Sequence, residues 1–511
     1  MTDPVTLRVA PTDLAVLADV EGRIALPVDS PDALGAAARR INRLTRGALA
    51  RFMASERYAK LKVGEAATLA FPAGLAAEAL DIVRLPRRAS AVETRKAGVA
   101  LAKLKGKAAV TLLAGPQRHA AELGFGMALR GYSYDDMRSK KPDADDAPKT
   151  PGDITLMVSK PDEVEAALVP LRALSEGVFL TRDLINAPAN ILTTITFAER
   201  LLALRDLGVE VEVLEEADLE RLGMGSLLSV GKGSDSPTKV VVMQWKGGAD
   251  DAAPLALVGK GVIFDTGGYS LKAAGGMEDM TMDMGGAGTV AGVMHTLARR
   301  GAKANVVGLV GLVENMISGG ATRPGDVVRS MKGDTIEVIN TDAEGRMLLA
   351  DVLWYAQDRF KPAGLIDLAT LTGAVIVALG HEMAGVFSND DALCNAVMKA
   401  AAAEGEGAWR LPLAPAFDRK LKSQIADMKN IGGRDGGATI AAQFLQRFVR
   451  DETPWVHLDI AGVGYVKAET SYAPQGPTGW GVMALNRLVA DRFETEVEAK
   501  NEATDETKDG A

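Results

Sequence analysis

The chain has 511 residues, 47% of them hydrophobic and 5% aromatic, and its formal net charge is −9. This composition excludes a disordered chain, and the length predicts two domains instead of one. There is no apolar run of about 18 residues to span a membrane, and the amino terminus lacks the basic and apolar stretches of a signal peptide. The single cysteine, Cys394, excludes an intramolecular disulfide and favours a cytoplasmic location.

The charged and histidine residues also limit the partners that we expect. A net charge of −9 argues against a surface that coats nucleic acid. The four histidines are far apart in the sequence: His119, His295, His381 and His457. A metal site in this chain would therefore be built mainly from carboxylates, which suits Mn²⁺, Mg²⁺ or Zn²⁺.

The first 160 residues mix short strands with helices. Strands are predicted at 6–9, 108–113 and 154–158, and one Arg-rich amphipathic helix is predicted at 31–53. The stretch between 138 and 153 is rich in Lys, Asp and Pro, which predicts a solvated loop.

A long helix is predicted at 161–186, because apolar residues recur at helical spacing and the sequence Asn-Ala-Pro ends the run. The domain junction is expected inside this helix, near residue 170. The expected organisation is an N-terminal α/β domain with an oligomerisation or regulatory role (1–170), a catalytic domain (171–490) and a polar, acidic tail (491–511).

From about residue 190, strand-like and helical runs alternate. Helices are predicted at 286–300 and 347–360. The predicted strands are 209–213, 239–245, 254–258, 305–313, 336–339, 364–371 and 455–460. This alternation predicts an α/β fold, in which a mostly parallel central sheet is flanked by helices on both faces.

The segment Asn340-Thr341-Asp342-Ala343-Glu344-Gly345-Arg346 lies between a predicted strand and a predicted helix, where open α/β sheets place their sites. If this segment is extended, the alternate side chains of Asp342, Glu344 and Arg346 project in the same direction. Acidic residues at such a position also commonly cap the helix. For these two carboxylates alone, both interpretations stay open.

A second charged cluster follows the predicted strand at 254–258. Lys260, Asp265, Lys272 and Asp283 stand there among glycines and apolar residues. Each has an ordinary explanation by itself, as a solvated lysine, a turn-forming aspartate or a helix-capping aspartate. Charged groups in apolar surroundings are costly unless they are paired or metal-bound, so the joint pattern indicates a functional site.

Together these motifs resemble the leucyl (cytosol) aminopeptidase family of the bacterial type. The resemblance rests on residues 258–261, 264–268, 283–286 and 340–346, and it extends over 180–490. It implies a metal-dependent hydrolase that releases N-terminal amino acids, preferentially leucine and similar apolar residues, from peptide substrates. Members of the family are homohexamers, so the same assembly is expected here.

The resemblance also implies the metal ligands. One divalent ion would be held by Lys260, Asp265, Asp283 and Glu344, and a second by Asp265, Asp342 and Glu344. Mn²⁺ or Zn²⁺ are the expected ions, with Co²⁺ or Mg²⁺ as alternatives. Two dications about 3.5–4 Å apart repel each other unless shared carboxylates lie between them, which supports bridging by Asp265 and Glu344. A ligating Lys260 must be neutral, and an adjacent dication would lower its pKa.

The remaining site residues are assigned by the same resemblance. Lys272 would be the cation that stabilises the tetrahedral intermediate, and Arg346 would hold a bicarbonate that moves a proton. The pocket for the substrate side chain would include Met280, Asn340, Thr370 and Gly373.

Two other functions stay open at this point. Carboxylate-bridged metals also serve phosphoryl transfer, so a two-metal phosphoesterase or nuclease is one alternative, although the sequence has no evident basic channel. An aminopeptidase with an added DNA-binding regulatory role is the other, supported by the Arg-rich run 39–46. Because the chain is acidic, we interpret this run as a solvated face or a subunit contact.

Overall fold

The computed structural model describes residues 2–139 and 152–494. The chain divides into two compact units, Met1–Phe179 with Glu469–Pro474, and Leu180–Ala468 with Gln475–Ala511. Most of the predicted loop at 138–153 and of the predicted tail at 491–511 lies outside the described residues. Within the described ranges, no helix is long and apolar enough to cross a membrane.

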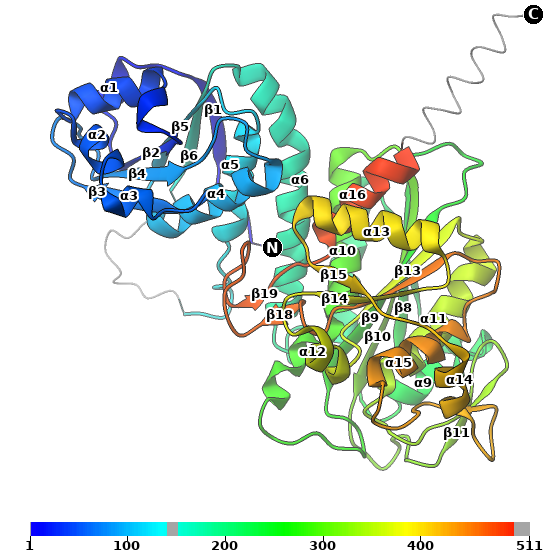
Figure 1. Ribbon diagram of the computed structural model, residues 1–511. Helices are drawn as coiled ribbons and strands as arrows, with labels where there is room; N and C mark the ends of the chain where they lie inside the picture. The colour runs from blue at the N-terminus through cyan, green and yellow to red at the C-terminus, as the bar shows by residue number, and fades with distance from the viewer. Residues whose placement is uncertain (1, 140–151, 495–511) are drawn as a thin grey trace, which may run out of the picture. The chain divides into compact units, whose positions relative to one another are not determined.

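The first unit is built on a six-stranded sheet in the order β1-β6-β5-β2-β4-β3 (Figure 1). Its neighbouring strands are parallel except for the edge pair β3–β4. Successive residues of β2, Ile24 and Ala25, belong to different apolar clusters, so both faces of the sheet are covered. The strands are β1 Leu7–Pro11, β2 Arg23–Val28, β3 Ala66–Ala70, β4 Ala79–Arg84, β5 Val110–Gly115 and β6 Ile154–Val158; the helices are α1 Ala36–Leu44, α2 Ala48–Met53, α3 Glu56–Ala59, α4 Ala91–Lys105 and α5 Ala120–Arg130. The long helix α6, Pro161–Asn186, begins in the first unit and ends in the second.

The single helix predicted at 31–53 is wrong. The structure has two helices there, α1 and α2, because the chain turns at Arg46 and Gly47, whose φ angles are 51° and 82°. Glycine adopts a positive φ without steric cost, which makes it a natural breaker at this position. The side-chain Oδ1 of Asn42 then accepts a hydrogen bond from the N–H of Ala50 at 2.9 Å and holds the first turn of α2.

The second unit contains an eight-stranded sheet in the order β15-β14-β17-β13-β9-β10-β8-β7. The four central strands, β17, β13, β9 and β10, are mutually parallel. The strands are β7 Glu210–Leu214, β8 Lys239–Lys246, β9 Leu255–Asp265, β10 Asn305–Asn315, β13 Gly364–Ala369, β14 Ala384–Ser388, β15 Ala408–Arg410 and β17 Trp455–Asp459. The predicted α/β class is therefore confirmed.

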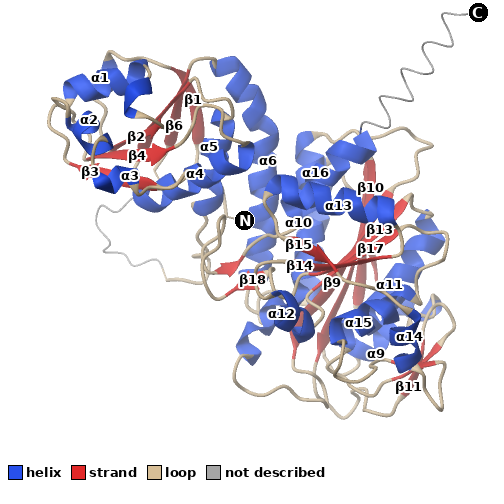
Figure 2. Ribbon diagram, viewed as in Figure 1, coloured by secondary structure: helices blue, strands red, loops and turns tan. Residues whose placement is uncertain are grey.

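Helices cover both faces of this sheet, with α10, α13 and α16 on one side and α9, α11 and α15 on the other (Figure 2). A Cβ added at Gly259 of β9 would lie 2.6 Å from Ala287 Cα of α10, whereas one at Gly311 of β10 would lie 2.9 Å from the Leu348 side chain of α11. Glycines therefore let both helices pack closely on the sheet. The helices of this unit are α7 Thr194–Leu202, α8 Glu216–Arg221, α9 Gly225–Gly231, α10 Gly285–Arg300, α11 Glu344–Phe360, α12 Gly373–Leu379, α13 Asp391–Glu404, α14 Pro415–Asp418, α15 Gly437–Gln446 and α16 Val482–Leu488.

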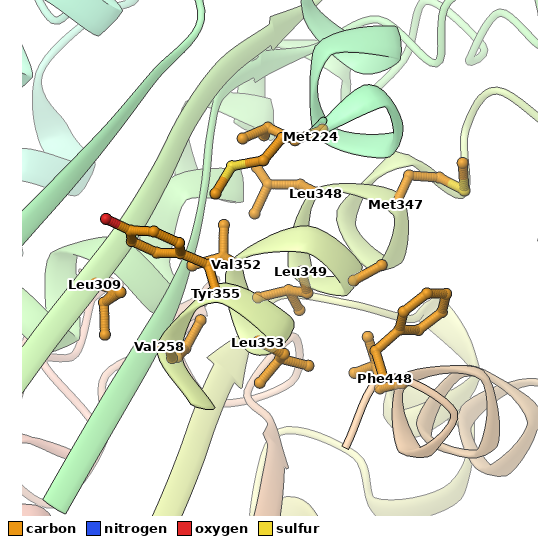
Figure 3. Close-up of a cluster of buried hydrophobic side chains, with 14 of the residues drawn as sticks. Met224, Val258, Leu309, Met347, Leu348, Leu349, Val352, Leu353, Tyr355 and Phe448 are labelled. Atoms are coloured by element: carbon orange, nitrogen blue, oxygen red, sulfur yellow. The ribbon is translucent and has the colours of Figure 1, made fainter. Parts of the chain in front are cut away.

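The main core of the second unit lies between α11 and the sheet. Leu348, Val352 and Leu353 of α11 point toward Val258 of β9 and Leu309 of β10 (Figure 3). All five side chains are fully buried. Near-continuous apolar runs such as β9 are the expected sequence of a parallel strand with both faces covered.

The strand predicted at 336–339 exists as β12 (Thr335–Glu337), but it does not belong to the central sheet. It pairs instead with β11 (Val327–Arg329) and with β16 (Met428–Lys429) in a separate three-stranded sheet. Only the central residue of β12, Ile336, is fully buried in the core, and its polar neighbours in the strand are partly exposed.

Candidate active site

The site residues gather where the central parallel strands end. Asp265 ends β9, Asn315 ends β10, Thr370 follows β13 and Asp459 ends β17. Because these strands are parallel neighbours, their carboxyl ends meet at one edge of the sheet, which is the usual place for a ligand in an open α/β fold.

Lys260 projects from the middle of β9 toward the face that α11 covers, since the adjacent Gly259 and Gly261 lie against α10. Its Nζ lies 2.8 Å from Asp283 Oδ1 and 2.8 Å from Glu344 Oε1, and it donates to the carbonyl oxygen of Thr370 at 2.8 Å. The side chain is buried. Burial alone would lower its pKa, but the surrounding carboxylates outweigh burial and raise it. These carboxylates favour the ammonium form of Lys260, whereas a dication bound beside it would act in the opposite direction.

A second group of carboxylates lies next to Lys260. Asp265, Asp342 and Glu344 each place one carboxylate oxygen in this group, and the three oxygens lie within 4.8 Å of one another. Lys272 reaches this group, with its Nζ 2.7 Å from Asp265 Oδ2 and in contact with Asp342. Burial opposes the charge of Lys272, but Asp265 and Glu344 raise its pKa.

The electrostatics of the cluster show an excess of negative charge. Burial, followed by the charge of Glu344, raises the pKa of Asp265 to about 6. Burial also raises the pKa of Asp283 and that of Asp342. Only Glu344 has a lowered pKa, because the two lysines overcome its burial. Four carboxylates share two ammonium groups, so the cluster favours further cations.

The side chain of Asp283 also indicates that the cluster favours a further cation. Its Oδ1 is bonded to Lys260 and to the Thr370 hydroxyl, which donates at 2.8 Å. Its Oδ2 is buried and has no hydrogen-bond partner among the described residues. A buried carboxylate oxygen without a donor is costly unless a ligand satisfies it.

The expectation that 340–346 is extended is wrong. The side-chain Oδ1 of Asn340 accepts from the N–H of Asp342 at 2.9 Å, which folds the segment into a turn. Helix α11 then begins at Glu344, and its N-cap residue, Ala343, makes no side-chain cap. Asp342 and Glu344 therefore converge through a turn and the first helical residue, and neither of them caps the helix.

Arg346 lies in the first turn of α11 and is buried. Its Nη1 donates to the carbonyl oxygen of Asn430 at 2.9 Å, and its Nε has no partner among the residues that the structure describes. Burial lowers the pKa of Arg346 to about 10, although Glu344 and Asp459 act in the opposite direction. It remains a cation at neutral pH with donor capacity to spare.

The four residues predicted for the substrate pocket occupy different settings. Met280 is half-buried in a 3₁₀ helix, Met277–Met284, and Gly373 is exposed at the start of α12. Asn340 lines a small cavity together with Glu344. The Thr370 hydroxyl donates to Asp283, so the structure brings this residue directly onto the carboxylate cluster.

Two buried asparagines organise the site, and sequence analysis did not select either as a site residue. Asn315 donates to Asp265 Oδ1 at 2.7 Å. Asn430 accepts from the N–H of Ile339 at 2.9 Å and donates to the carbonyl oxygen of Asn340 at 2.7 Å. A polar residue that ends the long apolar run of β10 was the available signal for Asn315.

Comparison with known proteins identifies the family. The model of the cytosol aminopeptidase family, catalytic domain, matches residues 179–486, which is more than half of the chain. The chain belongs to the cytosol aminopeptidase family. The resemblance predicted from the sequence motifs is therefore confirmed, and as a cytosol aminopeptidase the chain is a hydrolase of the leucyl aminopeptidase type.

Related proteins and structures cover nearly the whole cytosol aminopeptidase chain. A probable cytosol aminopeptidase of Cereibacter sphaeroides is 59% identical over 97% of this chain and 100% of its own length. One from Dinoroseobacter shibae is 60% identical over the same shares. Among solved structures, a mutant of tomato leucine aminopeptidase has a TM-score of 0.83 at 30% identity and covers 96% of this chain and 98% of its own. The bottromycin maturation enzyme BotP in complex with Mn has a TM-score of 0.78 at 34% identity, covering 93% of this chain and 99% of its own. These matches favour neither the phosphoesterase nor the DNA-binding alternative.

Proposed function

We propose that this aminopeptidase depends on two divalent cations held by Lys260, Asp265, Asp283, Asp342 and Glu344. The observation that carries the proposal is the excess of buried carboxylates, including the Asp283 oxygen that has no partner within the described chain. Carboxylate oxygens suit Mn²⁺ or Zn²⁺, with Co²⁺ and Mg²⁺ as alternatives. When bound, such a pair supplies Lewis-acid activation of a water molecule and of the scissile carbonyl. The related BotP was solved with Mn, which supports this choice of ion.

The protein's own groups then have distinct roles. Glu344 contacts Lys260 and also lies in one group with Asp265 and Asp342, so Asp265 and Glu344 would help to hold both cations. The Thr370 hydroxyl fixes the rotamer of Asp283. Lys272 is partly exposed while it contacts Asp265 and Asp342, so its ammonium group is placed to stabilise negative charge that develops on the substrate carbonyl.

Arg346 cannot act as a base, because its guanidinium stays protonated at neutral pH. Its buried Nε, which has no partner among the described residues, supports a role in holding a small anion such as bicarbonate beside the reacting groups. An anion held there would supply a proton acceptor close to the carboxylate cluster.

We infer that the substrate is a peptide with a free amino terminus and an apolar first residue such as leucine. Met280, Asn340, Thr370 and Gly373 would contact that first side chain, and the flexible thioether of Met280 suits an aliphatic group. The first compact unit, with its own sheet and two apolar clusters, would serve assembly or regulation in a cytoplasmic homohexamer. Sedimentation of the intact protein measures that assembly.

The test removes metal with a chelator and restores Mn²⁺, Zn²⁺, Co²⁺ or Mg²⁺ separately, with hydrolysis of leucine amide and other aminoacyl amides as the readout. At least one ion should restore activity, with leucine and similar apolar residues preferred. Glu344→Gln should lower kcat/KM by more than about 100-fold, since disturbing even the partners of metal ligands costs 10–100-fold.

Glu314→Gln is the matched control, because Glu314 lies at the same sheet edge but its carboxylate accepts from the Ser234 hydroxyl at 2.6 Å. This control should retain nearly full activity. The proposal fails if no ion restores activity or if Glu344→Gln behaves like Glu314→Gln.

A further inference from the structure

The carboxyl end of β10 holds a buried asparagine at an irregular point of the sheet. β9 and β10 pair in regular parallel register as far as Val313 opposite Val262. The register then shifts, so that Asn315 comes opposite Asp265. The shift places one extra residue in β9, and bulges of this kind commonly re-aim side chains beside active sites.

Asn315 uses both N–H donors of its side-chain amide at this position. Its Nδ2 donates to Asp265 Oδ1 at 2.7 Å and to the carbonyl oxygen of Thr341 at 3.0 Å. Both neighbours are acceptors, which decides the orientation of the amide without ambiguity. The main-chain oxygen of Asn315 accepts from both the N–H and the hydroxyl of Thr266, at 3.0 and 2.8 Å.

These contacts determine which oxygen of Asp265 is free to face the carboxylate cluster. Oδ1 accepts from Asn315 and from the N–H of Gly267 at 2.8 Å, so its acceptor positions are occupied. Oδ2 faces Lys272 and the other carboxylates. Because an amide is neutral, Asn315 orients the Asp265 carboxylate and leaves its negative charge in place. A lysine or arginine at this position would neutralise that charge.

The same amide also reaches the loop that carries Asp342. The Thr341 hydroxyl donates to the carbonyl oxygen of Gly267 at 2.6 Å and accepts from the N–H of Ser270 at 2.8 Å. The N–H of Thr341 in turn donates to the Ser270 hydroxyl at 3.1 Å. Asn315 therefore ties together the loop of Lys272, the loop of Asp342 and the carboxylate of Asp265.

We propose that Asn315 is a positioning residue that holds Asp265 and the 340–344 loop in the geometry needed to bind the cations. The inference rests on the proposed function, because it takes Asp265 and Asp342 as metal ligands. Loss of Asn315 should weaken metal binding about 10–100-fold, which is the usual effect of removing a group that orients a ligand. Activity lost in this way should return in part when the metal concentration is raised.

The chain offers a matched control at the other end of the same strand. Asn305 begins β10, and its side chain makes three hydrogen bonds, to the N–H of Gly248 and to the carbonyl oxygens of Ala249 and Ala252. Asn305→Ala therefore removes three side-chain hydrogen bonds, one more than the two that Asn315→Ala removes, but far from the carboxylates. Asn315→Ser, which keeps a single donor, provides a milder variant in case Asn315→Ala does not fold.

The experiment titrates Mn²⁺ into metal-stripped wild type, Asn315→Ala, Asn315→Ser and Asn305→Ala, and follows bound Mn²⁺ by electron paramagnetic resonance alongside kcat, KM and melting temperature. The inference predicts weaker Mn²⁺ binding in both Asn315 variants, with the serine variant intermediate, and wild-type Mn²⁺ binding in Asn305→Ala. Wild-type Mn²⁺ affinity in the Asn315 variants, even with a lower melting temperature, would overturn it. If the wild type binds no Mn²⁺, the titration is repeated with whichever of Zn²⁺, Co²⁺ and Mg²⁺ restores its activity. A wild-type protein that binds none of the four ions would overturn the proposed function itself and this inference with it.

Discussion

Gly345 is the residue that leaves room for the Lys260 side chain. A Cβ at Gly345 would lie 2.7 Å from Cδ and Cε of Lys260 and 2.8 Å from Nζ. Carbon atoms in contact lie about 3.5–4.0 Å apart, so Gly345→Ala should push the lysine away by about 1 Å. The three polar contacts of Nζ, each 2.8 Å long, would then exceed hydrogen-bonding distance.

The expected effect falls on activity more than on stability. A displacement of about 1 Å at a catalytic site can cost ~100-fold in rate, so we expect kcat/KM to fall by about that factor. Alanine is favoured over glycine in a helix by about 1 kcal/mol, which offsets part of a charge-assisted hydrogen bond worth about 1.5–3 kcal/mol. The melting temperature should therefore change far less than the activity.

The assay is hydrolysis of leucine p-nitroanilide at saturating metal, together with thermal unfolding. Gly319→Ala is the control, because a Cβ there meets no atom within 4 Å. The reasoning is refuted if Gly345→Ala keeps kcat/KM within about threefold of wild type, a barrier change below ~0.7 kcal/mol. That result would mean that Lys260 can shift without losing its function.

Two further predictions concern stability. Gly286→Ala should prevent α10 from packing on the sheet, because the added Cβ would lie 2.0 Å from the carbonyl oxygen of Leu368. The free energy of unfolding measured in urea should therefore fall by more than about 4 kcal/mol. Burial raises the pKa of Asp351 to about 7, although the N–H groups of Leu227 and Met331 oppose the shift. The folded protein then binds more protons than the unfolded chain between about pH 4 and 7, so the free energy of unfolding falls as pH rises through that window. Asp351→Asn should flatten this slope in urea titrations.

Specific results would contradict each of these. A Gly286→Ala protein with wild-type unfolding would show that α10 can move away from β13 at no cost. A pH slope that persists in Asp351→Asn would assign the proton uptake to other carboxyl groups.

Local patterns predict many strands of the second unit's main sheet. The runs at 239–245, 305–313 and 455–460 occur as β8, β10 and β17, because strands buried on both faces need continuous apolar sequence. The strands β2 and β4 of the first unit were missed. β2 contains Pro27, and β4 contains Asp81, which is buried because the Arg23 guanidinium donates to it at 2.7 and 2.9 Å and the Thr68 hydroxyl at 2.6 Å. Such a partner is invisible to a local pattern.

Sequence motifs were enough to predict the family and the chemical types of the site residues, since carboxylates and lysines among glycines are local features of the chain. They did not determine how the groups meet. Asp265, Asp283 and Asp342 come from a strand end, a 3₁₀ helix and a turn, and only the order of the parallel strands brings these elements to one edge. The turn at Asn340 replaced the expected extended segment, and the shifted register at Asn315 decided which oxygen of Asp265 faces the cluster. The turn at Asn340 is a local contact between residues two positions apart. The contact between Asn315 and Asp265 joins residues 50 positions apart, which a local pattern does not report, so packing of the sheet decided it.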